Sequence, residues 1–140
     1  MVSFSPRELA FINSNEICRL ATASKEGVPH VVPVNYIFLD GYFYVATDYD
    51  TKKYRNVKEN NRMALLIDIH KPNTALLIEG IAYIIERGEE FSLLYPMFYK
   101  KFDWVRADPW SEGEAPFLRI VPMKKVSWGS APGRRQSHLE

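Results

Sequence analysis

Apolar residues along the chain gather in six short stretches, and clusters of polar residues, glycine and proline separate them. This pattern is typical of β-strands bounded by turns. The sequence therefore predicts strands over residues 17–23, 30–38, 42–47, 62–70, 74–86 and 117–128. The centre of the fourth stretch, residues 64–67, is wholly apolar, and we expect it to be buried.

A short helix is predicted to precede the strands. Ser5 and Glu8 have the three-residue spacing of a capping box. Pro6 would occupy the first helical position, where its fixed φ suits the helix. Apolar residues follow on one side, and the polar run of residues 13–15 is expected to end the helix.

Two further segments have the spacing of helices. Residues 50–60 predict a short helix, and residues 89–102 predict a longer one with apolar residues on one side. Pro96 is expected to kink or split the longer helix, because proline removes a backbone donor and clashes with the preceding turn. Residues 103–115 are predicted to form a loop.

Several residues predict where the strands turn or become irregular. Asp40-Gly41 is a strong signal for a tight hairpin. Pro29 and Pro33 cannot donate to a strand ladder, so the strand that holds them is expected to lie at an edge or to contain a bulge. Gly80, inside a long strand, indicates a bend or a close approach of two backbones.

The order of elements predicts a mainly β fold with peripheral helices. Hairpin connections dominate, so the sheet is expected to be antiparallel, with six strands curled around one core as a small barrel. The length of 140 residues suits one domain, which we predict over residues 1–129. Residues 130–140 are predicted to be a flexible polar tail.

Charge and composition narrow the function classes. Lys and Arg total 18 and Asp and Glu total 17, so no overall field attracts nucleic acid or an acidic membrane. The longest apolar runs, such as residues 75–78, fall far short of the ~20 residues that span a bilayer. The single cysteine, Cys18, excludes an internal disulfide, and the first residues lack the pattern of a signal peptide. We therefore expect a cytoplasmic protein.

The segment of residues 47–55 is the first candidate for chemistry. Lys52 and Lys53 would lie in the first turn of a helix, where the helix dipole favours anions over cations. A bound phosphate would remove this conflict by accepting hydrogen bonds from the free amides, the Thr51 hydroxyl and both lysines. The alternative is a solvated helix face on which Asp50 and a neighbouring aspartate offset the lysines.

The second candidate is the strand that contains Pro33. Val32, Val34 and Tyr36 alternate along it and would line one face. A flat aromatic ligand could lie against such an edge, with backbone groups and Asn35 reaching its polar rim. An ordinary core strand has the same pattern, so this alternative stays open.

Other reactive residues carry weaker signals. His30, His70 and His138 have no metal-ligand spacing, so no metal site is predicted, and Cys18 is expected to be a small core residue. Neither a dinucleotide-binding nor a Walker-type glycine loop is present. Tyr36, Tyr49 and His30 are considered as catalytic groups only because they lie in these two candidate segments.

Read in order, these segments resemble the pyridoxamine 5'-phosphate oxidase-like flavoproteins. The similar stretches are residues 19–24, 27–34, 43–53, 60–66, 78–82, 119–122 and 126–129. The resemblance implies a split β-barrel that binds FMN as a homodimer, with the flavin in a groove between subunits.

Carried over by position, the resemblance assigns a set of cofactor contacts. Thr47, Thr51, Lys52 and Lys53 would hold the FMN phosphate. Val32, Pro33, Val34, Asn35 and Tyr36 would pass along the flavin ring and ribityl chain, with Ala46 beside them. Ala75 matches a position from which the partner subunit touches the ring in some relatives, and the aromatic residues between Trp104 and Trp128 could fill the subunit interface.

The resemblance leaves the activity open. Pyridoxine phosphate oxidation itself is not expected, because the Arg119-Ile120-Val121-Pro122 stretch has no Arg-x-His pattern upstream. The leading hypothesis is an FMN-dependent oxidoreductase acting on a small molecule, with a nicotinamide as a possible reductant. The alternatives are a deazaflavin-dependent reductase, or a non-enzymatic binder of flavin or of haem, in which His30 or His70 would ligate the iron.

Overall fold

The structure is a computed structural model, and it describes residues 2–129. The predicted tail, residues 130–140, lies outside the described residues. In chain order the elements are α1 (Pro6–Asn13), β1 (Ile17–Ala23), β2 (Pro29–Asn35), β3 (Ile37–Leu39), β4 (Tyr42–Ala46), α2 (Lys52–Glu59), β5 (Arg62–Ile69), β6 (Thr74–Ile85), α3 (Glu89–Lys101), α4 (Asp103–Ala107) and β7 (Phe117–Gly129).

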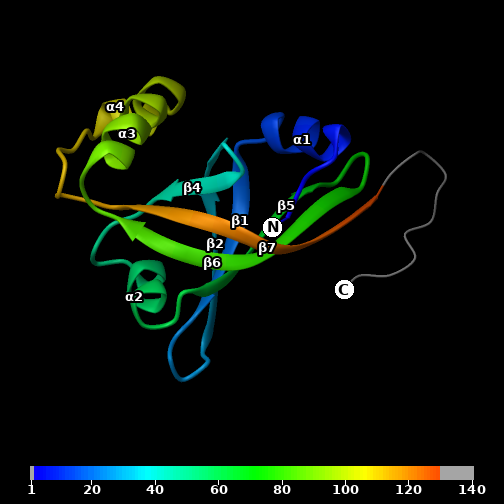
Figure 1. Cartoon of the computed structure of the whole chain (residues 1–140), viewed down its shortest axis with the longest axis horizontal. Helices are drawn as coiled ribbons and strands as arrows, with labels where there is room; N and C mark the ends of the chain where they lie inside the picture. Colours follow the sequence, from blue (N-terminus) through cyan, green and yellow to red (C-terminus); the bar gives the residue numbers. More distant parts are fainter. Residues whose placement is uncertain (1, 130–140) are drawn as a thin grey trace.

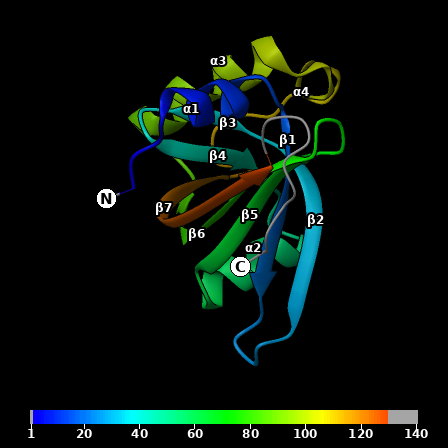
Figure 2. The same ribbon diagram turned by 90° about the vertical axis from the view of Figure 1, so that its right-hand side faces the viewer.

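One antiparallel sheet contains all the strands, in the order β2-β1-β5-β6-β7-β4-β3. The sheet curls into a half-barrel, with α3 and α4 side by side beyond β4 and α2 on the other side (Figure 1). The β1–β2 hairpin projects from this body, and β2 runs along its outer edge (Figure 2). The predicted mainly β, antiparallel, barrel-like fold is confirmed.

The sheet has seven strands in the described residues rather than the six predicted, because the second predicted strand divides at Tyr36. Asn35 pairs with Ile17 of β1, whereas Ile37 pairs with Tyr44 of β4. The chain thus changes partner within two residues. Strands β2 and β3 are the two outer strands of the sheet. Because only Tyr36 separates them, the opposite edges of the sheet must meet there, and the sheet must curl.

Tyr36 is locked at this junction by three contacts. Its side chain is 1% exposed, and its hydroxyl donates to the Ile12 carbonyl at 2.6 Å. Its ring packs edge-on against Phe43, with centroids 5.7 Å apart, and its amide donates to the Glu16 carbonyl at 3.0 Å. Both neighbours of the junction, the end of α1 and strand β4, are therefore fixed to it.

Two apolar clusters stabilise the fold. One fills the inside of the curl and includes Leu20, Leu65 and Ile78, all 0 or 1% exposed. The other lies where α3 and α4 cover β4 and β7, and it includes Phe98 and Phe117, both fully buried. The second cluster holds the helical segment against the end of β4, which positions the site described below.

The predicted boundaries of the helices are partly confirmed. The capping box is present, because the Glu8 amide donates to the Ser5 hydroxyl and the Glu8 carboxylate accepts from the Ser5 amide. Of the two outcomes expected at Pro96, a kink or a split, the split does not occur, since α3 continues through Pro96 with its apolar side buried. Residues 103–115 are also not entirely loop, because α4 occupies their first turn.

The predicted irregularities in the sheet are confirmed. Asp40 and Gly41 have φ values of 51° and 88°, which a tight hairpin turn requires. Pro33 lies on the edge strand β2. The ladder between β6 and β7 slips at Gly80, where an added Cβ would lie 2.3 Å from the Val121 carbonyl oxygen. None of the helices in residues 2–129 is both long enough and apolar enough to cross a membrane.

Replacing Tyr36 with Phe tests the junction. The change leaves the buried Ile12 carbonyl without its partner, so we expect the free energy of unfolding to fall by about 1–3 kcal/mol in urea denaturation. Tyr83→Phe is the matched control, because the Tyr83 side chain is 42% exposed, and its effect should stay within about 0.5 kcal/mol. A Tyr36→Phe protein as stable as this control would contradict the assigned role.

Candidate functional site

The turn between β4 and α2 closes on two threonine hydroxyls. The Thr47 amide donates to the Pro116 carbonyl at 3.1 Å, which holds the end of β4 beside the start of β7. Thr51 caps α2: its hydroxyl accepts from the Tyr54 amide at 3.3 Å and donates to the Asp48 carbonyl at 2.8 Å. The Thr47 and Thr51 hydroxyl oxygens lie 2.9 Å apart, so the structure brings these two predicted residues together.

The first turn of α2 is cationic. It holds Lys52 and Lys53 and no acidic residue. Lys52 is exposed, whereas Lys53 is half-buried, and neither forms an ion pair with any residue in 2–129. Burial lowers the pKa of the Lys53 ammonium below its ordinary value, and the Asp48 carboxylate offsets part of that effect. A half-buried cation beside the free amides of a helix start is a site that favours an anion.

Helix α2 is held in place by a buried side-chain hydrogen bond that the sequence did not indicate. The Asn56 amide donates to the Thr22 hydroxyl of β1 at 3.1 Å, and both residues are 4% exposed. A buried polar pair of this kind is costly to break. It therefore fixes the orientation of the helix that carries Lys52 and Lys53.

Strand β2 presents an alternating edge. Val32 and Val34 are half-buried on the inner side, opposite Leu20 and Cys18 of β1, whereas Pro33 is exposed. Because Pro33 has no amide proton, the edge lacks one backbone donor there. The side chains of Val32 and Val34 thus pack on the barrel. A ligand at this edge would contact the backbone of β2.

Asn35 has both ends of its side chain engaged. Its amide nitrogen donates to the Glu16 carbonyl at 3.1 Å, and its amide oxygen accepts from the Trp104 indole nitrogen at 2.9 Å. The second contact joins the end of β2 to α4. It places a residue from the predicted loop beside one of the predicted cofactor contacts.

The three residues considered for catalysis lie in different surroundings. The Tyr36 side chain is enclosed in the core, where burial raises its pKa, so it is not open to a ligand. The Tyr49 hydroxyl donates to Glu86 at 2.8 Å, and burial, with this bond, raises the pKa of Tyr49 to about 12. His30 is half-buried in β2, and its Nδ1 is buried without a partner in the described part of the chain. Cys18 is buried in β1, which raises the pKa of its thiol to about 12 and keeps it protonated.

A cavity of about 360 Å³ opens between the end of β4 and the segment around α4. Its lining consists of Ala46, Thr47, Asp48, Trp104, Asp108, Pro109, Trp110, Glu114 and Ala115. Two predicted contacts, Ala46 and Thr47, therefore share a cavity with Trp104, which bonds Asn35. We name this space the tryptophan cavity. Sequence reasoning missed its polar wall, because residues 103–115 were expected to be loop and interface.

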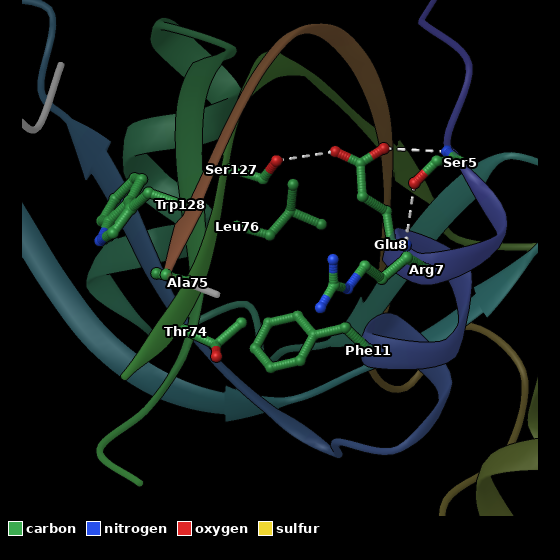
Figure 3. A pocket seen from close by; sticks show the side chains of 10 residues that line it. Ser5, Arg7, Glu8, Phe11, Thr74, Ala75, Leu76, Ser127 and Trp128 are labelled. Carbon is green, nitrogen blue, oxygen red and sulfur yellow. Dashed lines mark hydrogen bonds between the residues drawn. The ribbon is translucent and has the colours of Figure 1, made fainter. Parts of the chain in front are cut away.

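A second, smaller cavity of about 200 Å³ lies where α1 meets the start of β6 and the end of β7. Figure 3 shows the Arg7 side chain extending into it and Ala75 at its wall. Glu8 accepts hydrogen bonds from Lys125 at 2.5 Å and from Ser127 at 3.0 Å. Burial acts to raise the pKa of Glu8, but these bonds and the Ser5 amide lower it below its ordinary value.

One protomer does not bring Ala75 to the cationic turn. The Tyr49–Glu86 hydrogen bond places that turn just beyond the last residue of β6, whereas Ala75 is the second residue of the same strand. About ten residues of strand separate them, which is roughly 30 Å. A ligand that touches both positions would therefore need a second subunit.

Comparison with known proteins places the chain among relatives. A protein of Saccharomyces cerevisiae described as a pyridoxamine 5'-phosphate oxidase homolog is 33% identical over 41% of this chain and 35% of its own length. The match thus spans about a third of that relative. The 5a,11a-dehydrotetracycline/5a,11a-dehydrooxytetracycline reductase of Streptomyces rimosus is 27% identical over 90% of this chain and 83% of that protein.

Solved structures share the fold at low sequence identity. The heme storage protein HutZ from Vibrio cholerae has a TM-score of 0.76 at 15% identity, over 91% of this chain and 95% of that one. An FAD-binding protein from Mesorhizobium loti has a TM-score of 0.71 at 22% identity, over 89% of this chain and 94% of that one. At such identities the likeness concerns the fold alone.

The sequence profile of one family covers nearly all of the described fold. The family is that of pyridoxamine 5'-phosphate oxidase, and the profile matches residues 4–125. This range contains the cationic turn, strand β2 and the tryptophan cavity. The protein therefore belongs to the pyridoxamine 5'-phosphate oxidase family.

Proposed function

We propose that the protein is an FMN-dependent oxidoreductase that holds the flavin phosphate at the start of α2. The observation that carries this proposal is Lys53, which is half-buried and has no ion pair in residues 2–129. It lies in the first turn of the helix whose cap, Thr51, faces the Thr47 hydroxyl. A phosphate ester at neutral pH supplies the missing negative charge and several hydrogen-bond acceptors. The family membership and the reductase and FAD-binding proteins among the similar proteins support a flavin as the source of that phosphate.

The hydroxyls must rearrange when the phosphate binds. The Thr51 proton is directed to the Asp48 carbonyl, so the proton between the two hydroxyls comes from Thr47. Both protons are thus used within the turn. A bound phosphate would draw one of them to itself, while the free amides at the helix start and Lys53 donate without rearrangement.

The rest of the flavin would lie along the β2 edge. In this arrangement the backbone of Val32 to Asn35 follows the ring and ribityl chain, and Ala46 leaves room beside them. The Tyr36 side chain takes no part, because it is enclosed in the core. The flavin supplies the hydride or electron transfer, and the chain binds, orients and shields it.

We propose that a homodimer completes the site. Ala75 lies far along β6 from the cationic turn, so only a second copy could bring an Ala75 to the ring. A symmetric pair would form two equivalent grooves.

The proposal includes two further points. We expect the protein to act in the cytoplasm, with a nicotinamide that docks transiently to reduce the flavin. A deazaflavin cofactor needs the same phosphate site and is the alternative to FMN.

Haem binding is a second candidate, and one observation favours it. His30 is half-buried, and its buried Nδ1 has no hydrogen-bond partner in the described residues, so axial ligation of an iron would fall to its other ring nitrogen, Nε2. A visible spectrum after titration separates the candidates. Flavin bands that shift on binding support the first, whereas a Soret band that is lost in His30→Ala supports the second.

The double variant Lys52→Ala/Lys53→Ala tests the phosphate site. Two charge-assisted hydrogen bonds are lost, so FMN affinity should fall about 100-fold, whereas riboflavin, which lacks the phosphate, should change less than about 3-fold. Fluorescence titration of both ligands measures this. Lys58→Ala, in the last turn of the same helix, is the control. Equal losses for FMN and riboflavin would reject the assignment.

The pH dependence of the FMN-to-riboflavin affinity ratio tests Lys53 itself. Because burial lowers its pKa, the ammonium loses its proton at a lower pH than an exposed lysine does. The ratio should therefore decline as the pH rises from about 7 toward about 10, and Lys53→Arg should reduce this decline, since arginine stays charged. A ratio that declines equally in both proteins would show that Lys53 does not face the phosphate.

A further inference from the structure

We infer that the tryptophan cavity is a binding site for a planar aromatic cation, such as a nitrogen heterocycle or an aromatic amine that carries positive charge. Only the role of this ligand, as the substrate beside the flavin, rests on the proposed function. The aromatic residues, the charge and the lining of the cavity support the binding site itself.

The aromatic wall is held rigidly. The Trp104 and Trp110 rings are nearly parallel, at 10°, with centroids 6.1 Å apart. Trp104 is fixed by its bond to Asn35 and stacks on Phe102 at 6.3 Å and 20°. Trp110 meets Tyr95 edge-on at 5.0 Å, and the Tyr95 hydroxyl accepts from its backbone amide. A preorganised wall of this kind loses little entropy when a flat ligand binds.

The Trp104 ring is also accessible. Its side chain is 44% exposed, which is unusual for an indole that makes so many contacts. The spacing of the two indoles leaves no room for a third ring between them. A ligand would therefore contact the exposed part of the Trp104 indole, at the mouth of the cavity.

The charge of the lining favours a cation. Asp48, Asp108 and Glu114 line the cavity, and no Lys or Arg does so within the described residues. The Asp108 side chain forms no ion pair there, and Glu114 uses one carboxylate oxygen to accept from the Ser111 amide at 2.6 Å. Carboxylates beside an indole face bind cations by direct attraction and by the cation–π interaction.

Two neighbouring cations reduce this charge without cancelling it. Lys53 interacts with Asp48 from the α2 side. The Arg87 guanidinium packs against Gly113, next to Glu114. Neither Lys53 nor Arg87 contacts Asp108 in these interactions. Its carboxylate is therefore the natural counter-ion of a bound cation.

The lining of the cavity suits a substrate site beside the cofactor rather than the whole cofactor site. Its volume of about 360 Å³ is at the lower end of the range for small-molecule pockets. A ligand of one or two fused rings fits within it, whereas its lining includes only two of the proposed flavin contacts, Ala46 and Thr47. Ala46 and Thr47 belong both to its wall and to the proposed flavin contacts, so its ligand would lie against the flavin.

The test uses two probes of the same shape, N-methylquinolinium and neutral quinoline, at a pH where quinoline is unprotonated. Titration calorimetry on the flavin-free protein should show the cation binding about 10-fold more tightly or better. Asp108→Asn should reduce this preference, and Trp104→Leu should weaken both probes. Glu26→Gln, which removes an acidic side chain in the β1–β2 turn, is the control that should change neither.

The results separate this inference from the proposed function. Equal affinity for both probes, no binding of either, or a preference unchanged in Asp108→Asn would overturn the cation site. Repeating the titration with saturating FMN should leave probe binding intact. Competition between FMN and the probe would also overturn the inference, because the cavity would then belong to the flavin. A cation site that persists while Lys52→Ala/Lys53→Ala leaves FMN affinity unchanged would reject the phosphate site alone.

Discussion

The structure depends on one junction, where Tyr36 joins the two outer strands of the sheet. Asn35 belongs to the ladder with β1 and Ile37 to the ladder with β4, so the chain crosses from one edge to the other in a single residue. The buried hydroxyl bond to Ile12 fixes this crossing to α1. Because the edges meet here, the end of β2 must lie near β4, and the candidate site forms where they converge.

The charges around Thr47 are divided between two neighbouring regions. On one side the first turn of α2 is cationic and holds two lysines without acidic partners in its own turn. On the other side the tryptophan cavity is lined by three carboxylates. An anionic cofactor tail and a cationic substrate would each find a complementary surface, and each would be repelled from the other's place. This division of charge would orient the proposed cofactor and substrate relative to each other, and it needs no catalytic side chain to do so.

Local features of the fold could be predicted from the sequence, because short-range physics decides them. The capping box at Ser5, the hairpin at Asp40-Gly41 and the bulge at Gly80 each depend on neighbouring residues or on the absence of a side chain. The pairing of Thr47 with Thr51 is also local, since four residues separate them. Residue types alone predicted Thr51 and the two lysines of this turn, whereas Thr47 was assigned through the family resemblance.

Long-range features could not be predicted in this way. Periodicity shows that residues 30–38 are extended, but it does not show that they change partners at Tyr36. The bond between Trp104 and Asn35 joins residues 69 positions apart, so nothing in the sequence around either one indicates it. The aromatic and acidic wall of the tryptophan cavity exists only because the second apolar cluster holds α4 against β4.

The central claim is that an anionic ester binds at the start of α2, and a crystal structure of the protein with FMN tests it most directly. The account predicts the phosphate within hydrogen-bond distance of the Lys53 ammonium, the first amides of α2 and a hydroxyl of Thr47 or Thr51. It also predicts an Ala75 from a second copy against the ring. A phosphate bound elsewhere, with Lys53 still unpaired, would contradict the account.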